Sequence, residues 1–104
     1  MLEAVEAIAA YAARGRKLFD TDRAIRDAIL YQIVILGEAA KSALSADPSI
    51  ERELPEVEWS PIARMRDRVT HHYWATDQDL VWQTATESAA ELRTALQGAL
   101  KRLR

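Results

Sequence analysis

The sequence predicts an all-α fold, an up-and-down four-helix bundle built as one domain over residues 1–104. Apolar residues recur at spacings of three and four in several segments, which is the helical period, and no segment alternates with the period of a strand. Glycine and proline are few, three of each, and 49% of the residues are hydrophobic. This composition fits a single globular core and excludes a disordered or collagen-like chain.

The first predicted helix begins at Leu2, with no capping residue before it, and is expected to end near Gly15. The second begins after Asp20 or Thr21, either of which can cap it, and continues to about Ala43. The positions that repeat with the helical period are Leu2, Val5, Ile8, Ala9 and Ala12 in the first helix and Ile25, Ala28, Ile29, Leu36 and Ala43 in the second.

The middle of the second helix has two unusual features. Apolar residues outside its stripe, at positions 30 and 33–35, predict that the helix is covered on all sides there. One small bundle leaves residues 33–36 with more apolar surface than it can cover, so we expect a homodimer through the second and third helices. Gly37 is unfavourable inside a helix and suggests the close approach of another helix.

A loop is predicted between the two halves of the chain. Residues 45–58 contain Asp47–Pro48 and Pro55 among alternating charges, a composition typical of a helix break. The third helix is expected to follow, with Ser60 as its N-cap and Pro61 in its first turn. Its apolar stripe consists of Ile62, Met65 and Val69.

The last helix is predicted after residues 72–76, where the helical pattern weakens. Thr76 or Asp77 can cap it, within a sequence similar to a capping box, and it is expected to run to the basic residues 101–104. The positions expected along it are Leu80, Thr84, Glu87, Leu92, Leu96 and Leu100.

The composition also limits the chemistry and the location. The chain has no cysteine, which excludes disulfides and cysteine-based sites, and its only histidines are the adjacent His71 and His72, which disfavours a histidine-rich metal site. The longest apolar stretch, residues 28–40, is interrupted and shorter than the roughly 20 residues of a membrane span. With no recognisable secretory signal at the N-terminus, we expect a cytoplasmic protein without a membrane partner.

Residues 64–73 read Arg-Met-Arg-Asp-Arg-Val-Thr-His-His-Tyr and bring cations, an acid, imidazoles and a phenol together. The net charge of −2 gives the whole chain no attraction for nucleic acid, but this segment is basic whereas residues 51–58 hold four glutamates. The sequence therefore allows a positive groove for phosphates on an acidic protein.

Helical geometry relates the residues of this segment. Asp67 and His71 are four apart, so the carboxylate can hold the imidazole and favour its protonated form. Arg66 and His71 lie about 140° apart around a helix. They converge only if the helix distorts after Val69, if the Arg66 side chain wraps around it, or if a second subunit completes the site.

Plainer readings of the same residues exist. Arginine and histidine on a helix more often form a solvated face, and Arg64 and Arg68 are expected to be such surface charges. Tyr73 and Trp74, near a predicted helix end, fit anchors of the core as well as they fit a reactive site.

Arg66, His71 and Tyr73 match the Arg-x4-His-x-Tyr signature of HEPN-domain ribonucleases, and the surrounding sequence resembles the HepT toxin family. The resemblance covers about residues 2–100 and includes residues 37–41, Trp59 with Ile62 and Met65 before the motif, and residues 77–82 after it. His71, and not His72, has the spacing of the signature. His72 stands at a spacer position where the family has a small residue, often glycine.

The resemblance implies a HEPN-like dimer that acts as a metal-independent endoribonuclease on tRNA or mRNA, with no cofactor. The RNA 2′-OH would attack the adjacent phosphorus, with His71 as general base or acid and Arg66 stabilising the charge of the phosphorane. Asp67 would support His71. HEPN proteins have a cleft at a dimer interface, and a two-fold dimer would supply two copies of His71.

The resemblance also implies a partner. HepT toxins pair with MntA, a minimal nucleotidyltransferase antitoxin, in a type VII-like toxin–antitoxin system, and MntA transfers AMP from ATP to the motif tyrosine, here Tyr73. The added bulk and charge would fill the groove that RNA must occupy. This chain has no ATP-binding signature, so the nucleotide would be bound by the partner.

Two other functions remain open at this stage. The chain could be a catalytically inactive HEPN-like helical dimer that binds RNA or a nucleotidyltransferase and uses Arg66 only to contact phosphate. It could also be a purely structural subunit.

Overall fold

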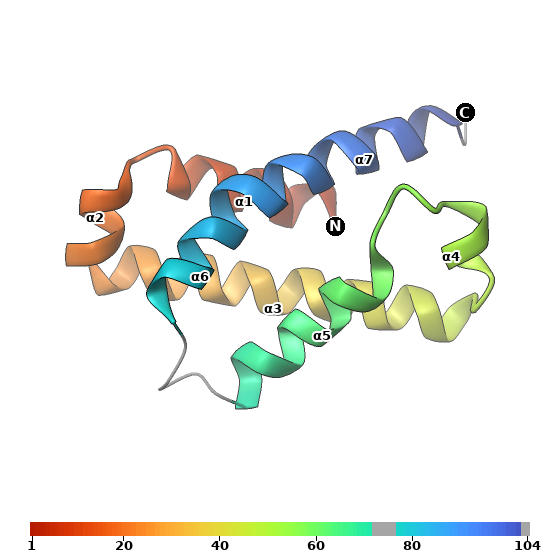
Figure 1. Cartoon of the computed structure of the whole chain (residues 1–104), viewed down its shortest axis with the longest axis horizontal. Helices are drawn as coiled ribbons and strands as arrows, with labels where there is room; N and C mark the ends of the chain where they lie inside the picture. The colour runs from red at the N-terminus through yellow and green to blue at the C-terminus, as the bar shows by residue number, and fades with distance from the viewer. Residues whose placement is uncertain (72–76, 103–104) are drawn as a thin grey trace.

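A computed structural model describes residues 1–71 and 77–102, and all regular secondary structure in these residues is helical. Four long helical segments, α1, α3, α5 and the continuous α6–η2–α7, run back and forth, which confirms the predicted all-α bundle (Figure 1). The helices are α1 (Leu2–Ala12), α2 (Arg16–Thr21), α3 (Arg23–Ala46), α4 (Ile50–Glu53), α5 (Trp59–His71), α6 (Gln78–Gln83), the π-helical segment η2 (Thr84–Ser88) and α7 (Ala89–Arg102).

The core forms around α3, which packs against α5 and α1, while α1 also packs against α7. Burial of large apolar side chains is the main stabilising contribution in such a bundle, at about 1.5–3 kcal/mol for each fully buried side chain. The largest fully buried side chains are Phe19, Ile8, Ile29, Val5 and Val69. The stripes predicted for the first three helices therefore face the core.

The start of α3 differs from the prediction. Asp22 is its N-cap, and its carboxylate accepts a hydrogen bond from the amide of Ala24 at 2.9 Å, so the caps expected at Asp20 or Thr21 are wrong. Both residues belong to the short helix α2, which the sequence pattern did not predict. Gly15 permits this extra turn, because its φ of 100° lies in the left-handed region that favours glycine.

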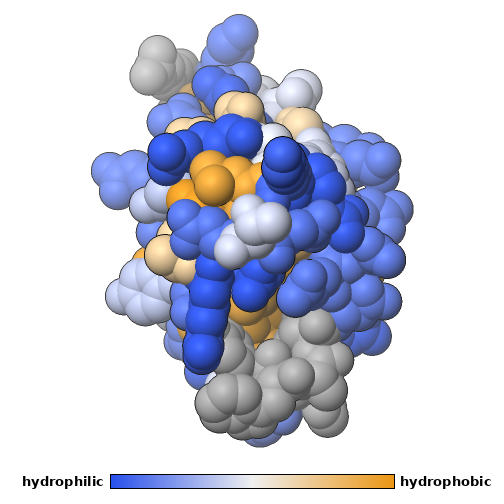
Figure 2. Space-filling model, turned by 90° about the vertical axis from the view of Figure 1, so that its left-hand side faces the viewer, coloured by the Kyte–Doolittle hydropathy of each residue, from blue (hydrophilic) through white to orange (hydrophobic). Residues whose placement is uncertain are grey.

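Helix α2 closes one end of the bundle against α6. The ring of Phe19 lies 5.2 Å from that of Trp82, and the Arg16 guanidinium lies within 5.9 Å of both ring centroids. Arg16 also donates to Asp20 at 2.8 Å and to Asp79 at 2.5 Å. The surface at this end is mainly hydrophilic, with smaller apolar areas between the polar side chains (Figure 2).

The segment predicted as a loop contains the short helix α4, and α3 extends into it as far as Ala46. Helix α5 begins two residues earlier than expected, at Trp59, whose indole donates to the Leu54 carbonyl at 3.2 Å. Ser60 is therefore not the N-cap. Its hydroxyl donates to Glu51 at 2.7 Å, which ties α5 to α4.

The last helical segment begins as expected after Asp77, its N-cap, whose carboxylate accepts from the amides of Asp79 and Leu80. Thr76, the other candidate cap, lies outside the described residues. The segment contains one stretch of π-helix, η2, which interrupts the predicted periodicity. The buried stripe consequently runs through Val81, Ala85, Ala89, Leu92, Leu96 and Ala99.

Helix α3 is, within residues 1–71 and 77–102, the one helix long and apolar enough by composition to cross a membrane. It has 24 residues, which is longer than the apolar stretch considered from the sequence. The central helix of a bundle has the same features, and its Ile25, Ile29 and Ile33 side chains are buried against the neighbouring helices.

Candidate functional site

Arg66 of the signature lies on the face of α5 that packs against α3. Its side chain is 25% exposed, and its guanidinium contacts two carboxylates. One terminal nitrogen forms an ion pair with Glu38 of α3, and the other donates to Oδ1 of Asp67 at 3.0 Å. The charge of Arg66 is therefore held at the junction of the two helices.

Gly37 makes this position of Arg66 possible. A side chain at residue 37 would collide with Arg66, because a Cβ placed there would lie 2.8 Å from its Cγ and 3.1 Å from its Cα, and closer still to its Cβ. The close helix approach suggested by a glycine inside a helix is thus observed, and the residue on the other side of the contact belongs to the signature.

Asp67 connects Arg66 to a second cation. Its Oδ1 accepts a hydrogen bond from Nζ of Lys41 at 3.0 Å in addition to the one from Arg66. These bonds, with the Lys41 bond the larger effect, hold the pKa of Asp67 below its ordinary value. We call Glu38, Lys41, Arg66 and Asp67 the α3–α5 charge cluster. It contains two cations and two anions.

The cluster provides hydrogen-bond or ion-pair partners for the two terminal nitrogens of Arg66 but not for its Nε. Nε of Arg66 is buried and has no hydrogen-bond partner among the described residues. A buried donor without a partner costs about 1–3 kcal/mol. The position of Arg66 is therefore not the one that would maximise its own hydrogen bonding.

His71 is the last residue of α5, and its side chain is exposed. It lies on the same helix face as Arg64 and Arg68, which are exposed as expected, because the three are spaced seven and three residues apart. Arg66 faces α3 instead. The structure therefore does not bring Arg66 and His71 together within one chain.

Two of the three ways in which these residues could converge are not observed. Helix α5 continues to His71, so it does not distort after Val69, and the Arg66 guanidinium turns toward Glu38 instead of wrapping around the helix. Completion of the site by a second subunit is the remaining way in which Arg66 and His71 could converge.

The expected pairing of Asp67 with His71 is also absent from the hydrogen bonds and ion pairs of the described chain. The Asp67 carboxylate is turned toward Lys41 and Arg66. Two permanent cations attract a carboxylate more strongly than an exposed imidazole does. His72 and Tyr73 lie outside the described residues.

Glu38 and Lys41 were not among the site residues predicted from the sequence. Both lie in the segment 37–41 that resembles HepT sequences, and they are three residues apart, so they share one face of α3. The glycine beside Glu38 was the signal that could have found them, since a close helix contact also brings the residues next to it within reach of the facing helix.

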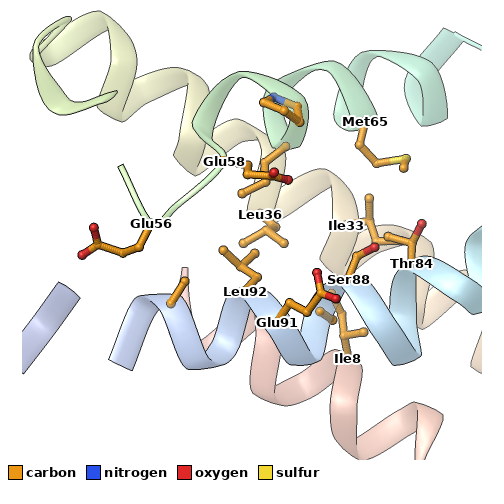
Figure 3. A pocket seen from close by; sticks show the side chains of 14 residues that line it. Ile8, Ile33, Leu36, Glu56, Glu58, Met65, Thr84, Ser88, Glu91 and Leu92 are labelled. Atoms are coloured by element: carbon orange, nitrogen blue, oxygen red, sulfur yellow. The ribbon is translucent and has the colours of Figure 1, made fainter. Parts of the chain in front are cut away.

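The structure also has a cavity of about 290 Å³ between α3, α5 and α7. Its floor is apolar, with Ile33, Leu36 and Leu92 facing into it (Figure 3). Glu56, Glu58 and Glu91 also line it, which disfavours binding of a phosphate group. No group of three or more His, Asp or Glu side chains in residues 1–71 and 77–102 is arranged to hold a metal ion.

Comparison with known proteins identifies the family. Residues 1–98 match the model of the family described as ribonuclease HepT-like. A Thermococcus cleftensis protein named as a probable ribonuclease HepT is 32% identical over 75 residues, which cover 72% of this chain and 66% of that protein. Two Methanocaldococcus jannaschii proteins provisionally named as RNases are also similar. The first is 28% identical over 82% of this chain and 71% of its own length. The second is 31% identical over 62% of this chain and 50% of its own length.

The matched part of the chain spans 50–71% of the length of these three relatives. No solved structure matches the chain with comparable significance. The family match covers nearly the whole chain, includes the signature helix and agrees with the all-α fold. The chain therefore belongs to the ribonuclease HepT-like family.

Proposed function

We propose that this chain is a HEPN-type endoribonuclease toxin that cleaves tRNA or mRNA without a metal ion. The observation that carries the proposal is the arrangement of Arg66 and His71 on one helix at the spacing of the family signature. Arg66 is held between two carboxylates, and His71 is exposed at the end of the helix. The names of the relatives as ribonucleases support the same activity.

The chemistry requires a proton acceptor, a proton donor and a cation. An imidazole can accept the proton of the RNA 2′-OH near neutral pH, and the 2′-oxygen then attacks the adjacent phosphorus. The bond from phosphorus to O5′ breaks, and O5′ takes a proton from a second imidazole. The products are a 2′,3′-cyclic phosphate and a 5′-OH. The terminal N–H groups of Arg66 that its carboxylates do not use would bind the phosphate oxygens.

A homodimer would supply the second imidazole. Tyr31 and Ile35 remain exposed on α3, at 64% and 38%, although Ile33 and Leu36 of the same helix are buried in the core of one chain. Tyr31, Ile35 and Glu38 are spaced four and three residues apart, so this apolar surface leads directly to the charge cluster. A two-fold axis beside it would place Arg66 of one protomer near His71 of the other.

The proposed control is exerted by a nucleotidyltransferase antitoxin of the MntA type in the cytoplasm. The oxygen of Tyr73 would attack the α-phosphorus of ATP bound by that partner and lose its proton, with release of pyrophosphate. The resulting AMP group would stand two residues from His71. Tyr73 lies outside the described residues, so this part of the proposal depends on the signature.

Cleavage of a labelled RNA by the purified chain tests the activity. We expect cleavage in the presence of EDTA and ends that carry a 2′,3′-cyclic phosphate and a 5′-OH. Arg66→Ala and His71→Ala should each lose about 100-fold or more in rate, as expected when a general base or a charge-stabilising group is removed. His72→Ala should keep most of the activity.

Measurement of RNA binding by the same variants separates the enzyme from a binding module. His71→Ala should bind RNA without cutting it, which would exclude a role limited to binding in the wild type. If His72 proves essential and His71 dispensable, the assignment of the signature is wrong.

A further inference from the structure

Among the ion pairs of the described residues, Glu38 is the only residue of α3 that pairs with Arg66, and this ion pair crosses the interface between α3 and α5. Asp67 contacts the other terminal nitrogen, from the adjacent position on α5. The two carboxylates thus hold both ends of one planar group. The orientation of that plane follows from Glu38, because Asp67 alone would leave the guanidinium free to turn about a single hydrogen bond.

We propose that Glu38 is a positioning residue for Arg66, and this inference rests on the ribonuclease activity proposed above. Glu38 fixes the guanidinium so that its remaining terminal N–H groups meet the phosphate in one orientation. Lys41 has a supporting part, because its bond to Asp67 at 3.0 Å keeps the second carboxylate in place.

The balance of charge in the cluster decides which kinetic constant Glu38 should affect. Glu38 and Asp67 offset the charges of Arg66 and Lys41, so the cluster attracts RNA weakly as a whole. Its contribution is orientation, which acts on the chemical step more than on binding. Removal of the Glu38 charge should therefore lower kcat and leave KM unchanged or lower, because repulsion of the RNA phosphates decreases.

Gly37 and the buried Nε distinguish this arrangement from an ordinary surface ion pair. The stem of Arg66 is fixed by its contact with Gly37, and Nε is buried without a partner, so the side chain is ordered up to its last rotatable bonds. Glu38, which is half exposed, orders the part that remains. An ion pair that only held α3 against α5 would not need to contact the guanidinium of a side chain whose stem is already fixed.

Three substitutions of Glu38 test the proposal by steady-state kinetics on a short fluorescent RNA. Glu38→Ala should lower kcat about 10- to 100-fold without raising KM, as expected for a misplaced catalytic group. Glu38→Gln keeps an acceptor oxygen at the same distance and should keep kcat within about threefold of the wild type. Glu38→Asp, one methylene shorter, should behave like Glu38→Ala.

Asp20→Asn is the matched control, since the Asp20 carboxylate is half-exposed like that of Glu38 and also pairs with an arginine, Arg16, but lies on α2. It should leave kcat and KM unchanged. A Glu38→Ala variant with wild-type kcat would overturn the proposal. An equal loss of activity in Glu38→Gln would also overturn it, and so would a loss that merely parallels unfolding of the variant in a melting curve.

A second measurement keeps the inference testable if the chain shows no ribonuclease activity. The NMR signal of the buried Arg66 Nε–H should be sharp and slow to exchange with solvent in the wild type, and broad or absent in Glu38→Ala but not in Asp20→Asn. An inactive wild type with this pattern would contradict the proposed function and retain the positioning role. A signal unchanged in Glu38→Ala would overturn the positioning role itself.

Discussion

Gly37 lies directly against the backbone and stem of Arg66 where α3 and α5 pack together, and no larger residue fits at position 37 while the two helices keep their separation. The same contact serves the packing of the two helices and the placement of the signature arginine. The helices pack tightly at the point where the signature arginine leaves α5, and the adjacent Glu38 meets the end of the same side chain.

The first prediction concerns the stability of this contact. Gly37→Ala should lower the free energy of unfolding by about 1–3 kcal/mol, because the added methyl group forces α3 and α5 apart. Gly98→Ala is the matched control, since Gly98 lies within α7 and a Cβ there meets nothing within 4 Å. It should raise stability by about 0.5–1 kcal/mol, the ordinary gain from replacing glycine in a helix. Urea denaturation of both variants measures the difference, and a Gly37→Ala protein as stable as the Gly98→Ala protein would contradict it.

The second prediction concerns acid stability. The pKa of Asp67 is lower in the folded chain than in the unfolded one, where it is about 3.9. The carboxylate therefore contributes stability above that unfolded value, and the contribution is lost as the pH falls through the lower pKa of the folded state. Stability measured between about pH 5 and pH 2 should decline less steeply in Asp67→Asn than in the wild type.

Lys41→Met provides a check on the cause. It removes the larger of the two bonds that lower the pKa of Asp67, so it should reduce the acid-dependent part of the stability while leaving Asp67 in place. Identical pH profiles for the wild type and both variants would show that this carboxylate is not linked to folding.

The parts of the fold that the sequence predicted depend on local signals. The stripe of α1 and the cap at Asp77 are read from residues within a few positions of one another. Gly37 belongs here too, because a glycine inside a helix is unusual in itself. Helix α2 was missed because its six residues are too few for a periodic pattern, and Thr21 and Asp20, which resembled caps, form its last turn.

The parts of the site that the sequence did not predict depend on contacts between distant residues. The bonds of Glu38 to Arg66 and of Lys41 to Asp67 join α3 to α5, and helical spacing gives no information on which residues of two helices meet. The expected Asp67 to His71 pair followed from spacing alone. It was displaced because Lys41, 26 residues away in sequence, is a stronger partner for the carboxylate.

The third prediction concerns the dimer. Light scattering should give a mass near twice 11.7 kDa for the wild type. Ile35→Asp should shift the protein toward the monomer and reduce cleavage, because it places a charge in the exposed apolar surface beside the charge cluster. Leu100→Asp is the matched control, as Leu100 is also exposed, at 45%, but lies near the end of α7. A wild type that stays monomeric at every concentration would contradict both the dimer and the shared site.

The fourth prediction concerns modification of Tyr73. Intact-mass spectrometry of the chain produced together with a nucleotidyltransferase of the MntA type should show one or more AMP increments, mapping to the peptide that contains Tyr73. Each AMP brings a phosphodiester with about one negative charge close to Arg66 and His71, so the modified protein should lose RNA cleavage through repulsion and steric overlap. Tyr73→Phe should take no AMP and, if it still cleaves RNA, should remain toxic to cells beside the partner. Tyr31 is the control phenol outside the signature, because it is exposed on α3 of one chain and lies in the surface proposed for the dimer. AMP on Tyr31 in place of Tyr73, or equal neutralisation of the wild type and Tyr73→Phe by the partner, would defeat the prediction.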